Sequence, residues 1–203
     1  DPDVVAGWRV PVVQLCEWND AYDLPGLGID NPAAAHMAVN HLAELGHRHV
    51  LHVEGPLDNV LGITRRKGFI EAARERGIEI ALHPGDFTMA SGVEAARSWA
   101  QMEKQPTAVF CASDECAFGF ISECDRLGFG VPKDVSVVGF DDVDLADRFI
   151  PPLTTIHQPR ARLGRRAAER LIEALREGRA PDPSYDLIAP YLVVRASTRP
   201  LDR

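Results

Sequence analysis

Short runs of β-branched residues alternate with longer segments of helical periodicity along this chain, and that alternation constrains the fold more than any other feature. The clearest runs cover residues 10–16, 49–53, 107–111 and 135–140. Between them, apolar residues recur at helical spacing. Because neighbouring parallel strands are joined through a crossover, usually a helix, the pattern predicts an α/β fold with a largely parallel sheet.

Glycine and proline mark where the intervening helices begin and end. Pro32 stands in the first turn of a helix that Gly46 ends, and Gly77 and Gly178 end two others. The remaining expected elements are a strand near residues 79–82, helices at about 91–104 and 114–127, a short strand at 153–156, a helix opening at Pro159 with the apolar stripe Leu163, Ala167, Leu171, Ala174 and Leu175, and extended chain over 181–200.

Composition excludes several classes of protein. The 203 residues suffice for one large or two small domains, and hydrophobic residues make up 45% of them. No apolar run approaches the roughly 18 residues that a membrane span needs. The net charge of −8 argues against nucleic-acid binding by this chain itself. Asp1-Pro2-Asp3 does not begin a secretory signal, so a cytoplasmic protein is expected.

Neither a cofactor nor a metal site is expected. The cysteines are too few and too irregularly spaced for a disulfide framework or a zinc site, so we expect reduced thiols at Cys16, Cys111, Cys116 and Cys124. Asp141, Asp142 and Asp144 resemble part of a calcium loop that lacks its glycine and its final glutamate. His47, Arg48 and His49 are interpreted as cationic side chains that complement carbonyl groups at a helix end.

Polar and aromatic side chains follow the predicted strands. In open parallel sheets, ligands bind beyond the carboxyl ends of the strands, where loops and helix N-termini converge. The residues that follow the five strands in chain order are Glu17 and Trp18, then Asn59 to Arg65, then Phe87, then Ser113 and Asp114, then Asp141 and Asp142. Carboxylates and a guanidinium suit vicinal hydroxyls, and aromatic faces suit stacking, so the set favours a sugar or a nucleoside.

Each candidate also has a purely structural interpretation. Asp114 would serve as a helix cap, Asp141 and Asp142 as turn residues, and Phe87 as part of the core. Considered one at a time, the residues do not decide between the two interpretations.

Seven sequence blocks follow one another in a characteristic order. They cover residues 28–31, 41–48, 55–58, 65–69, 106–114, 131–142 (VPKDVSVVGFDD) and 152–159 (PLTTIHQP). Their order resembles the effector-binding core of the lactose-repressor and galactose-repressor (LacI/GalR) family of bacterial transcription regulators. The resemblance extends over nearly all of residues 10–200.

The resemblance implies a fold like that of the type I periplasmic binding proteins, in which two Rossmann-like subdomains with parallel sheets are joined by three crossings and hold the ligand between them. It assigns residues 30–157 plus 188–203 to the C-terminal subdomain. Residues 1–29 plus 158–187 form an incomplete N-terminal subdomain, and the DNA-binding headpiece of the family is absent. The chain is therefore expected to be a fragment.

The resemblance also implies roles for single residues. Arg65 matches the arginine that grips the effector, and Asp141 matches the acidic residue after the fifth strand. Phe87 stands at the aromatic wall. Glu17 and Ser113 depart from the usual aspartate and asparagine, so the identity of the effector stays open. Arg160 replaces a residue that is often aromatic, and its charge fits an acidic sugar. With Trp18 and Asn59, these residues form the predicted ligand site.

The function implied is that of the effector-binding and dimerisation core of a repressor. A small molecule, a sugar or sugar derivative, would shift a homodimer between conformations that present the missing headpieces to operator DNA differently. The sequence leaves open whether the effector induces or corepresses, the operator, and dimer against tetramer.

Two other functions are alternatives to that of a regulator. An enzyme is disfavoured because the chain has no GxSxG, HExxH, Walker or CxxC motif, and Gly26-Leu27-Gly28 lacks the third glycine of a dinucleotide fingerprint. The second rival is an exported periplasmic sugar-binding protein of a transport system, which shares the fold. The missing signal, the four cysteines and the two longest blocks favour the regulator.

Overall fold

The computed structural model describes residues 10–19, 21–178, 181 and 184–201. The chain divides into two compact units: unit 1 is Asp1–Asp30 with Pro159–Pro190, and unit 2 is Asn31–Gln158 with Tyr191–Arg203. The sequence predicted divisions after residues 29, 157 and 187, whereas the units divide after Asp30, Gln158 and Pro190. No described helix is long and apolar enough to cross a membrane.

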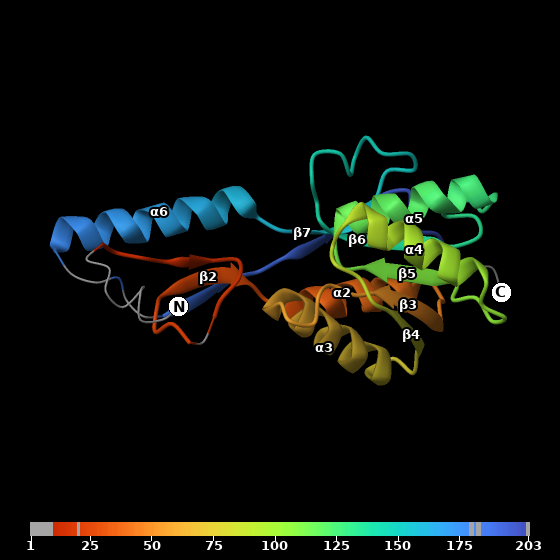
Figure 1. Cartoon of the computed structure of the whole chain (residues 1–203), viewed down its shortest axis with the longest axis horizontal. Helices are drawn as coiled ribbons and strands as arrows, with labels where there is room; N and C mark the ends of the chain where they lie inside the picture. The colour runs from red at the N-terminus through yellow and green to blue at the C-terminus, as the bar shows by residue number, and fades with distance from the viewer. Residues whose placement is uncertain (1–9, 20, 179–180, 182–183, 202–203) are drawn as a thin grey trace. The chain divides into compact units, whose positions relative to one another are not determined.

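Unit 2 is a six-stranded sheet between two pairs of helices (Figure 1). Its elements in chain order are α2 (Asn31–Glu44), β3 (His49–Val53), α3 (Val60–Glu75), β4 (Glu79–His83), α4 (Met89–Ala100), β5 (Ala108–Cys111), α5 (Asp114–Leu127), β6 (Ser136–Asp141), β7 (Thr154–His157) and β9 (Tyr191–Val193). Helices α2 and α3 pack together on one face of the sheet, and α4 and α5 on the other. The α/β fold with mostly parallel strands is as predicted.

The sheet order brings the site residues to one edge. The strands run β4-β3-β5-β6-β7-β9, and all pairs are parallel except β7 with β9. The carboxyl ends of β3 to β7 therefore lie along the same edge of the sheet. Strand β9 returns antiparallel to β7 and pairs Tyr191 with His157.

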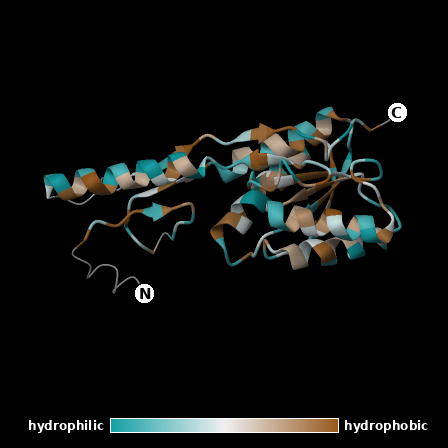
Figure 2. Cartoon of the chain, turned by 90° about the horizontal axis from the view of Figure 1, so that it is seen from above, coloured by the Kyte–Doolittle hydropathy of each residue, from teal (hydrophilic) through white to brown (hydrophobic). Residues whose placement is uncertain are grey.

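The two faces of this sheet are packed differently. On the α4 and α5 side, buried apolar residues such as Leu51, Val109 and Val137 meet Trp99 and Phe120. On the other side, the His52 ring stacks on the rings of Phe69 and Phe110, at centroid distances of 4.7 and 4.9 Å, and those two rings are 6.2 Å apart. The alternation of Leu51 with His52 and of Val109 with Phe110 follows from the two-residue period of a strand buried on both faces. Figure 2 shows these strands as a hydrophobic layer inside unit 2.

The interpretation of His47 as a cationic cap was wrong. His47 is 2% exposed, and its ring nitrogens lie 2.9 Å from the Thr107 hydroxyl and 3.1 Å from the Ser136 hydroxyl. Burial lowers its pKa below the ordinary value, so the ring is held in its neutral form. Only Arg48 acts as expected, because its Nη1 donates to the Ala43 carbonyl at 2.8 Å, near the end of α2.

Unit 1 contains a three-stranded parallel sheet and one long helix. Its elements are β1 (Gln14–Leu15), β2 (Gly26–Ile29), α6 (Arg160–Glu177) and β8 (Tyr185–Ile188), with the strand order β1-β2-β8. The predicted strand over residues 10–16 is much shorter than expected. Pro11 has no N–H group to donate, and the ladder to β2 begins only at the Gln14 N–H.

The pair Gly26 and Gly28 has a packing role. An added Cβ would lie 2.2 Å from the Tyr185 ring at Gly26 and 2.4 Å from the Tyr185 hydroxyl at Gly28. The aromatic ring thus lies directly on the backbone of β2, and only glycine leaves room for it.

Two helices differ from their predicted form. Helix α4 begins at Met89 instead of about residue 91, because Thr88 serves as its N-cap and accepts from the Ser91 N–H. The predicted apolar stripe of α6 is buried at Leu163, Ala167 and Ala174, but Leu175 is 64% exposed. Figure 2 shows α6 with hydrophilic and hydrophobic residues around its circumference.

Candidate functional site

Strained backbone gathers beyond the carboxyl ends of the strands. Among the described residues, the non-glycine residues with positive φ are Cys16 (67°), Phe87 (70°), Asp141 (119°) and Asp142 (55°). They follow or end strands β1, β4 and β6. Such conformations cost roughly 1–3 kcal/mol each and cluster at functional sites. The predicted site loops therefore carry independent backbone evidence for a specific role.

Arg65 is the best-held candidate. Its side chain projects from α3 and is 3% exposed. Nε donates to Asn31 Oδ1 at 2.9 Å and Nη1 to the Ala112 carbonyl at 2.6 Å. The guanidinium carbon lies 3.6 Å from the centre of the Phe140 ring, which is a close cation–π contact. A cation fixed from this many directions is preorganised to bind an anionic or hydroxyl-rich group.

Phe87 and Ser113 form one local arrangement. The Phe87 ring lies against Gly55, where an added Cβ would be 2.2 Å from it, and its centre is 5.4 Å from the Arg65 guanidinium carbon. The Ser113 hydroxyl donates to the Phe87 carbonyl at 2.6 Å and accepts from the Cys116 N–H as the N-cap of α5. Ser113 thus holds the left-handed Phe87 in place.

Asp141 and Asp142 end β6, and each carboxylate has a defined partner. Gln158 Nε2 donates to Asp141 Oδ1 at 3.0 Å. Arg195 Nη2 and His157 Nδ1 lie 2.6 and 2.7 Å from the two oxygens of Asp142. Burial alone would raise the pKa of Asp142, but the hydrogen bonds and charges of Arg195 and His157 outweigh it and lower that pKa.

Asp114 is a buried carboxyl group that connects α5 to β7 and to the loop after β6. It accepts from the Thr155 hydroxyl at 2.5 Å and from the Val143 N–H at 2.9 Å. Burial raises its pKa to about 7, against these two hydrogen bonds. The helix cap expected at Asp114 is supplied by Ser113 instead, and Asp114 fixes the chain just after Asp142.

The other predicted site residues lie in less constrained surroundings. Asn59 caps α3, because its Oδ1 accepts from the Leu61 N–H at 2.8 Å. In unit 1, the Trp18 ring lies 5.3 Å from the Tyr185 ring, Glu17 is exposed after β1, and Arg160 is the exposed first residue of α6. In unit 2 the structure brings Arg65, Phe87 and Ser113 together.

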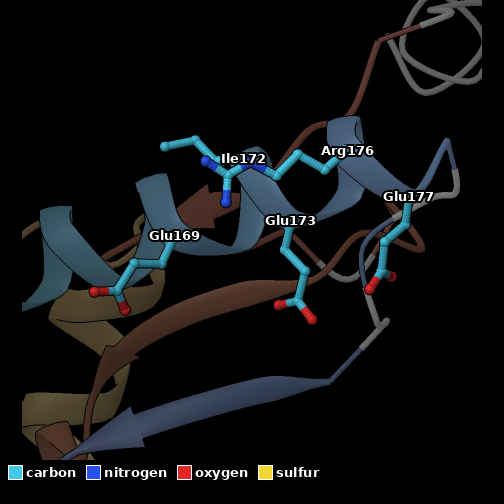
Figure 3. Close-up of a pocket in the computed structure, with 5 residues that line it drawn as sticks. All are labelled: Glu169, Ile172, Glu173, Arg176 and Glu177. Atoms are coloured by element: carbon cyan, nitrogen blue, oxygen red, sulfur yellow. The ribbon is translucent and has the colours of Figure 1, made fainter.

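A surface hollow on α6 is not a second site. It is lined by residues of this helix alone, Glu169, Ile172, Glu173, Arg176 and Glu177 (Figure 3). The three glutamates follow one another at four-residue spacing, as on the solvated face of a helix. No group of three or more potential metal ligands occurs among the residues that the structure describes.

Sequence reasoning missed the residues that hold the candidates in place. Asn31 and Phe140 fix Arg65, Gln158 orients Asp141, and His157 with Arg195 engages Asp142. Asn31, Phe140, His157 and Gln158 stand in the blocks that carry the family resemblance, which was the available signal.

Known proteins are similar to this chain in sequence. The protein family described as "Periplasmic binding protein-like domain" matches residues 39–198 of this chain. The repressor CytR of Escherichia coli K12 is 39% identical over 194 residues, which cover 94% of this chain and 57% of CytR. The chain therefore spans less than two thirds of that relative.

Solved structures give the same result. A LacI family transcriptional regulator from Enterococcus faecalis V583 with bound ribose superposes with a TM-score of 0.89 at 28% identity, covering 98% of this chain and 73% of that one. A dimeric Lac repressor superposes with a TM-score of 0.88 at 30% identity, covering 98% and 72%. The chain belongs to the periplasmic binding protein-like domain family and, within it, to the LacI-type transcriptional regulators.

Proposed function

We propose that this chain is the effector-binding core of a LacI-type transcriptional regulator and that it binds a sugar or sugar derivative without chemical conversion. The observation that carries the proposal is the Arg65 guanidinium, which is buried, stacked on Phe140 and held by Asn31 and Ala112. Asp141 ends the strand that also carries Phe140. A fixed guanidinium and a carboxylate are suited to adjacent hydroxyl groups.

The relatives support this ligand class. The Enterococcus faecalis regulator was solved with ribose, and CytR is named as a repressor. Phe87 supplies an aromatic face beside Arg65, which fits the apolar face of a sugar ring or a planar base. Whether Glu17, Trp18, Asn59, Ser113 and Arg160 contact the ligand remains a prediction from the sequence.

Ligand binding is tested by calorimetry and thermal shift. The probes are D-ribose, other pentoses and hexoses, sugar acids and ribonucleosides. A ligand at 100 times its Kd stabilises the folded chain by about 2.7 kcal/mol, which a thermal shift detects readily. For the probe that binds, Arg65→Ala and Asp141→Ala are expected to weaken affinity about 30-fold each, or about 2 kcal/mol, because each loses charge-assisted hydrogen bonds.

Two further variants control this experiment. Arg65→Lys keeps the charge but loses the planar fork, so we expect an intermediate loss. Arg76 follows the same helix, is exposed and bonds Asn40, so Arg76→Ala should bind like the wild type. Normal affinity in both Arg65→Ala and Asp141→Ala would refute the site.

Operator DNA is proposed as a partner of the whole regulator. A net charge of −8 makes this chain unsuited to hold the DNA backbone, so another part of the regulator would do so. Effector binding would act by shifting the chain between two conformations, as in other allosteric proteins.

We also propose a homodimer, in keeping with the dimeric Lac repressor among the similar structures. The loop between β6 and β7 exposes Leu145 at 48% and Ile150 at 88%, the highest value among the large apolar side chains that the structure describes. Ile150→Asp is expected to weaken dimerisation at least about tenfold if this loop is buried in the dimer. Analytical ultracentrifugation measures the effect, with Leu57→Asp, a 50% exposed leucine elsewhere in unit 2, as the control. Equal dimerisation of Ile150→Asp and wild type would exclude the loop.

A further inference from the structure

The turn that carries Asp141 is fastened through Asp142 to side chains from other parts of unit 2. Asp142, the next residue, bonds His157 Nδ1 at 2.7 Å and Arg195 Nη2 at 2.6 Å. The His157 ring stacks on Tyr191 at a centroid distance of 4.5 Å and an interplanar angle of 25°. We call Asp142, His157, Tyr191 and Arg195 the Asp142 clamp.

The clamp stands where the chain leaves and re-enters unit 2. His157 ends β7, one residue before the unit boundary at Gln158, and Tyr191 is the first residue of the unit after the chain returns. The two residues pair in register across β7 and β9. Arg195 follows β9 and also donates to the Leu153 carbonyl at 2.8 Å, just before β7. One carboxylate thus connects the end of β6 with the segments of unit 2 before the crossing at Gln158 and after the crossing at Pro190.

The backbone at Asp141 and Asp142 has an uncommon conformation where the clamp holds it. Asp142, with a φ of 55°, lies in the left-handed region that aspartate tolerates better than most residues, whereas the φ of 119° at Asp141 lies outside that region. Left to itself, the turn would relax to a conformation that aims Asp141 elsewhere. The ion pair with Arg195 is 18% and 14% exposed at its two side chains, so it is far less screened than a surface pair.

We propose that the Asp142 clamp positions Asp141 for the ligand and that His157 is a positioning residue through its hydrogen bond to Asp142. The inference rests on the proposed function, since Asp141 is the ligand contact. Asp142 itself would not touch the ligand.

Substitutions at His157 separate the hydrogen bond from the stacking contact. Asparagine places its amide nitrogen the same number of bonds from the backbone as Nδ1, so His157→Asn keeps the donor and loses the ring. His157→Phe keeps the ring on Tyr191 and loses the donor, and His157→Ala loses both. With D-ribose as the probe, or whichever sugar of the panel binds, Kd should rise about tenfold in His157→Phe and His157→Ala and less than about twofold in His157→Asn.

A second readout is independent of any ligand. Hydrogen–deuterium exchange of the unliganded chain should be at least about tenfold faster over residues 141–144 in His157→Phe and His157→Ala than in the wild type and His157→Asn. Exchange elsewhere in unit 2, and the thermal midpoint of His157→Asn, serve as controls for simple destabilisation.

The outcomes separate the two proposals. If no probe binds the wild type, the proposed ligand class fails while the exchange data still decide whether the clamp holds the turn. The clamp is overturned if exchange over 141–144 is unchanged in His157→Phe, or if it rises equally throughout unit 2. The positioning role is overturned if affinity follows the ring, so that His157→Phe binds normally and His157→Asn does not.

Discussion

Gly92→Ala is expected to destabilise unit 2 by about 3 kcal/mol or more, although alanine is the better helix former by about 1 kcal/mol. An added Cβ at Gly92 would lie 1.9 Å from the Cys116 carbonyl oxygen, and one at Gly119 would lie 2.0 Å from the Met89 carbonyl oxygen. These neighbours are backbone atoms and cannot rotate away. Helices α4 and α5 would have to separate, and the packing around Trp99 would be lost.

Gly164→Ala is the matched control. Gly164 is also helical, in α6, but an added Cβ there meets nothing within 4 Å. That variant is expected to gain about 0.5–1 kcal/mol from the lower entropy of the unfolded chain and from helix propensity. Urea unfolding followed by circular dichroism gives both values. If Gly92→Ala were as stable as Gly164→Ala, the close approach of α4 and α5 would be wrong.

The stability of unit 2 should also respond to pH through two buried groups with opposite effects. The pKa of His52 is lowered from 6.5 to about 4, mainly by burial. Its Nδ1–H donates to the Phe110 carbonyl at 2.9 Å, and its Nε2 has no partner among the described residues that would accept an added proton. The contribution of His52 to the free energy of unfolding is therefore complete above pH 6.5, and about 3 kcal/mol of it is lost as the pH falls towards 4.

Asp114 changes stability in the other direction. Its pKa is raised from 3.8 to about 7, so the fold favours the neutral acid. The contribution of Asp114 to the free energy of unfolding is complete below pH 3.8, and about 4 kcal/mol of it is lost as the pH rises through 7. Between pH 4 and pH 6.5 the two groups oppose each other, each with a slope of up to about 1.4 kcal/mol per pH unit. His41 and His47, whose pKa values burial also lowers, act in the direction of His52.

Single variants expose each slope. His52→Phe keeps an aromatic ring against Phe69 and Phe110 but cannot titrate, so its free energy of unfolding should fall relative to that of the wild type as the pH rises from 4 to 6.5. Asp114→Asn should rise over the same range. Urea unfolding at half-unit pH intervals measures the slopes. Parallel curves for wild type and both variants would contradict the assigned pKa shifts.

The sequence predicted those features that depend on local patterns. Residues 49–53 and 114–127 were predicted with the bounds observed for β3 and α5, because the spacing of their apolar residues is that of a buried strand and of a helix. The strand predicted over residues 10–16 was too long, because Pro11 has no N–H group and the ladder begins only at Gln14. The start of α4 was predicted too late, because Thr88 was not recognised as its N-cap.

The sequence predicted the side chains expected to contact the ligand but not the residues that hold them in place. Arg65, Phe87 and Asp141 could be named because they follow strands or resemble a family position. Their supports could not, since Asn31 lies 34 residues from Arg65 and Arg195 lies 53 from Asp142 in sequence. Contacts at such separations depend on the folded topology, which local periodicity does not determine.

The late return of the chain to unit 2 determines when this unit can fold during synthesis. Strand β7 receives its partner β9 only after all of Pro159–Pro190 has been made, and the last described residues then bond Val137 and Leu45 through Ser197 and Leu201. Until residues 191–193 have left the ribosome, one side of β7 is unpaired and can pair with another chain. A nascent chain that stalls before residue 191 therefore exposes an aggregation-prone strand.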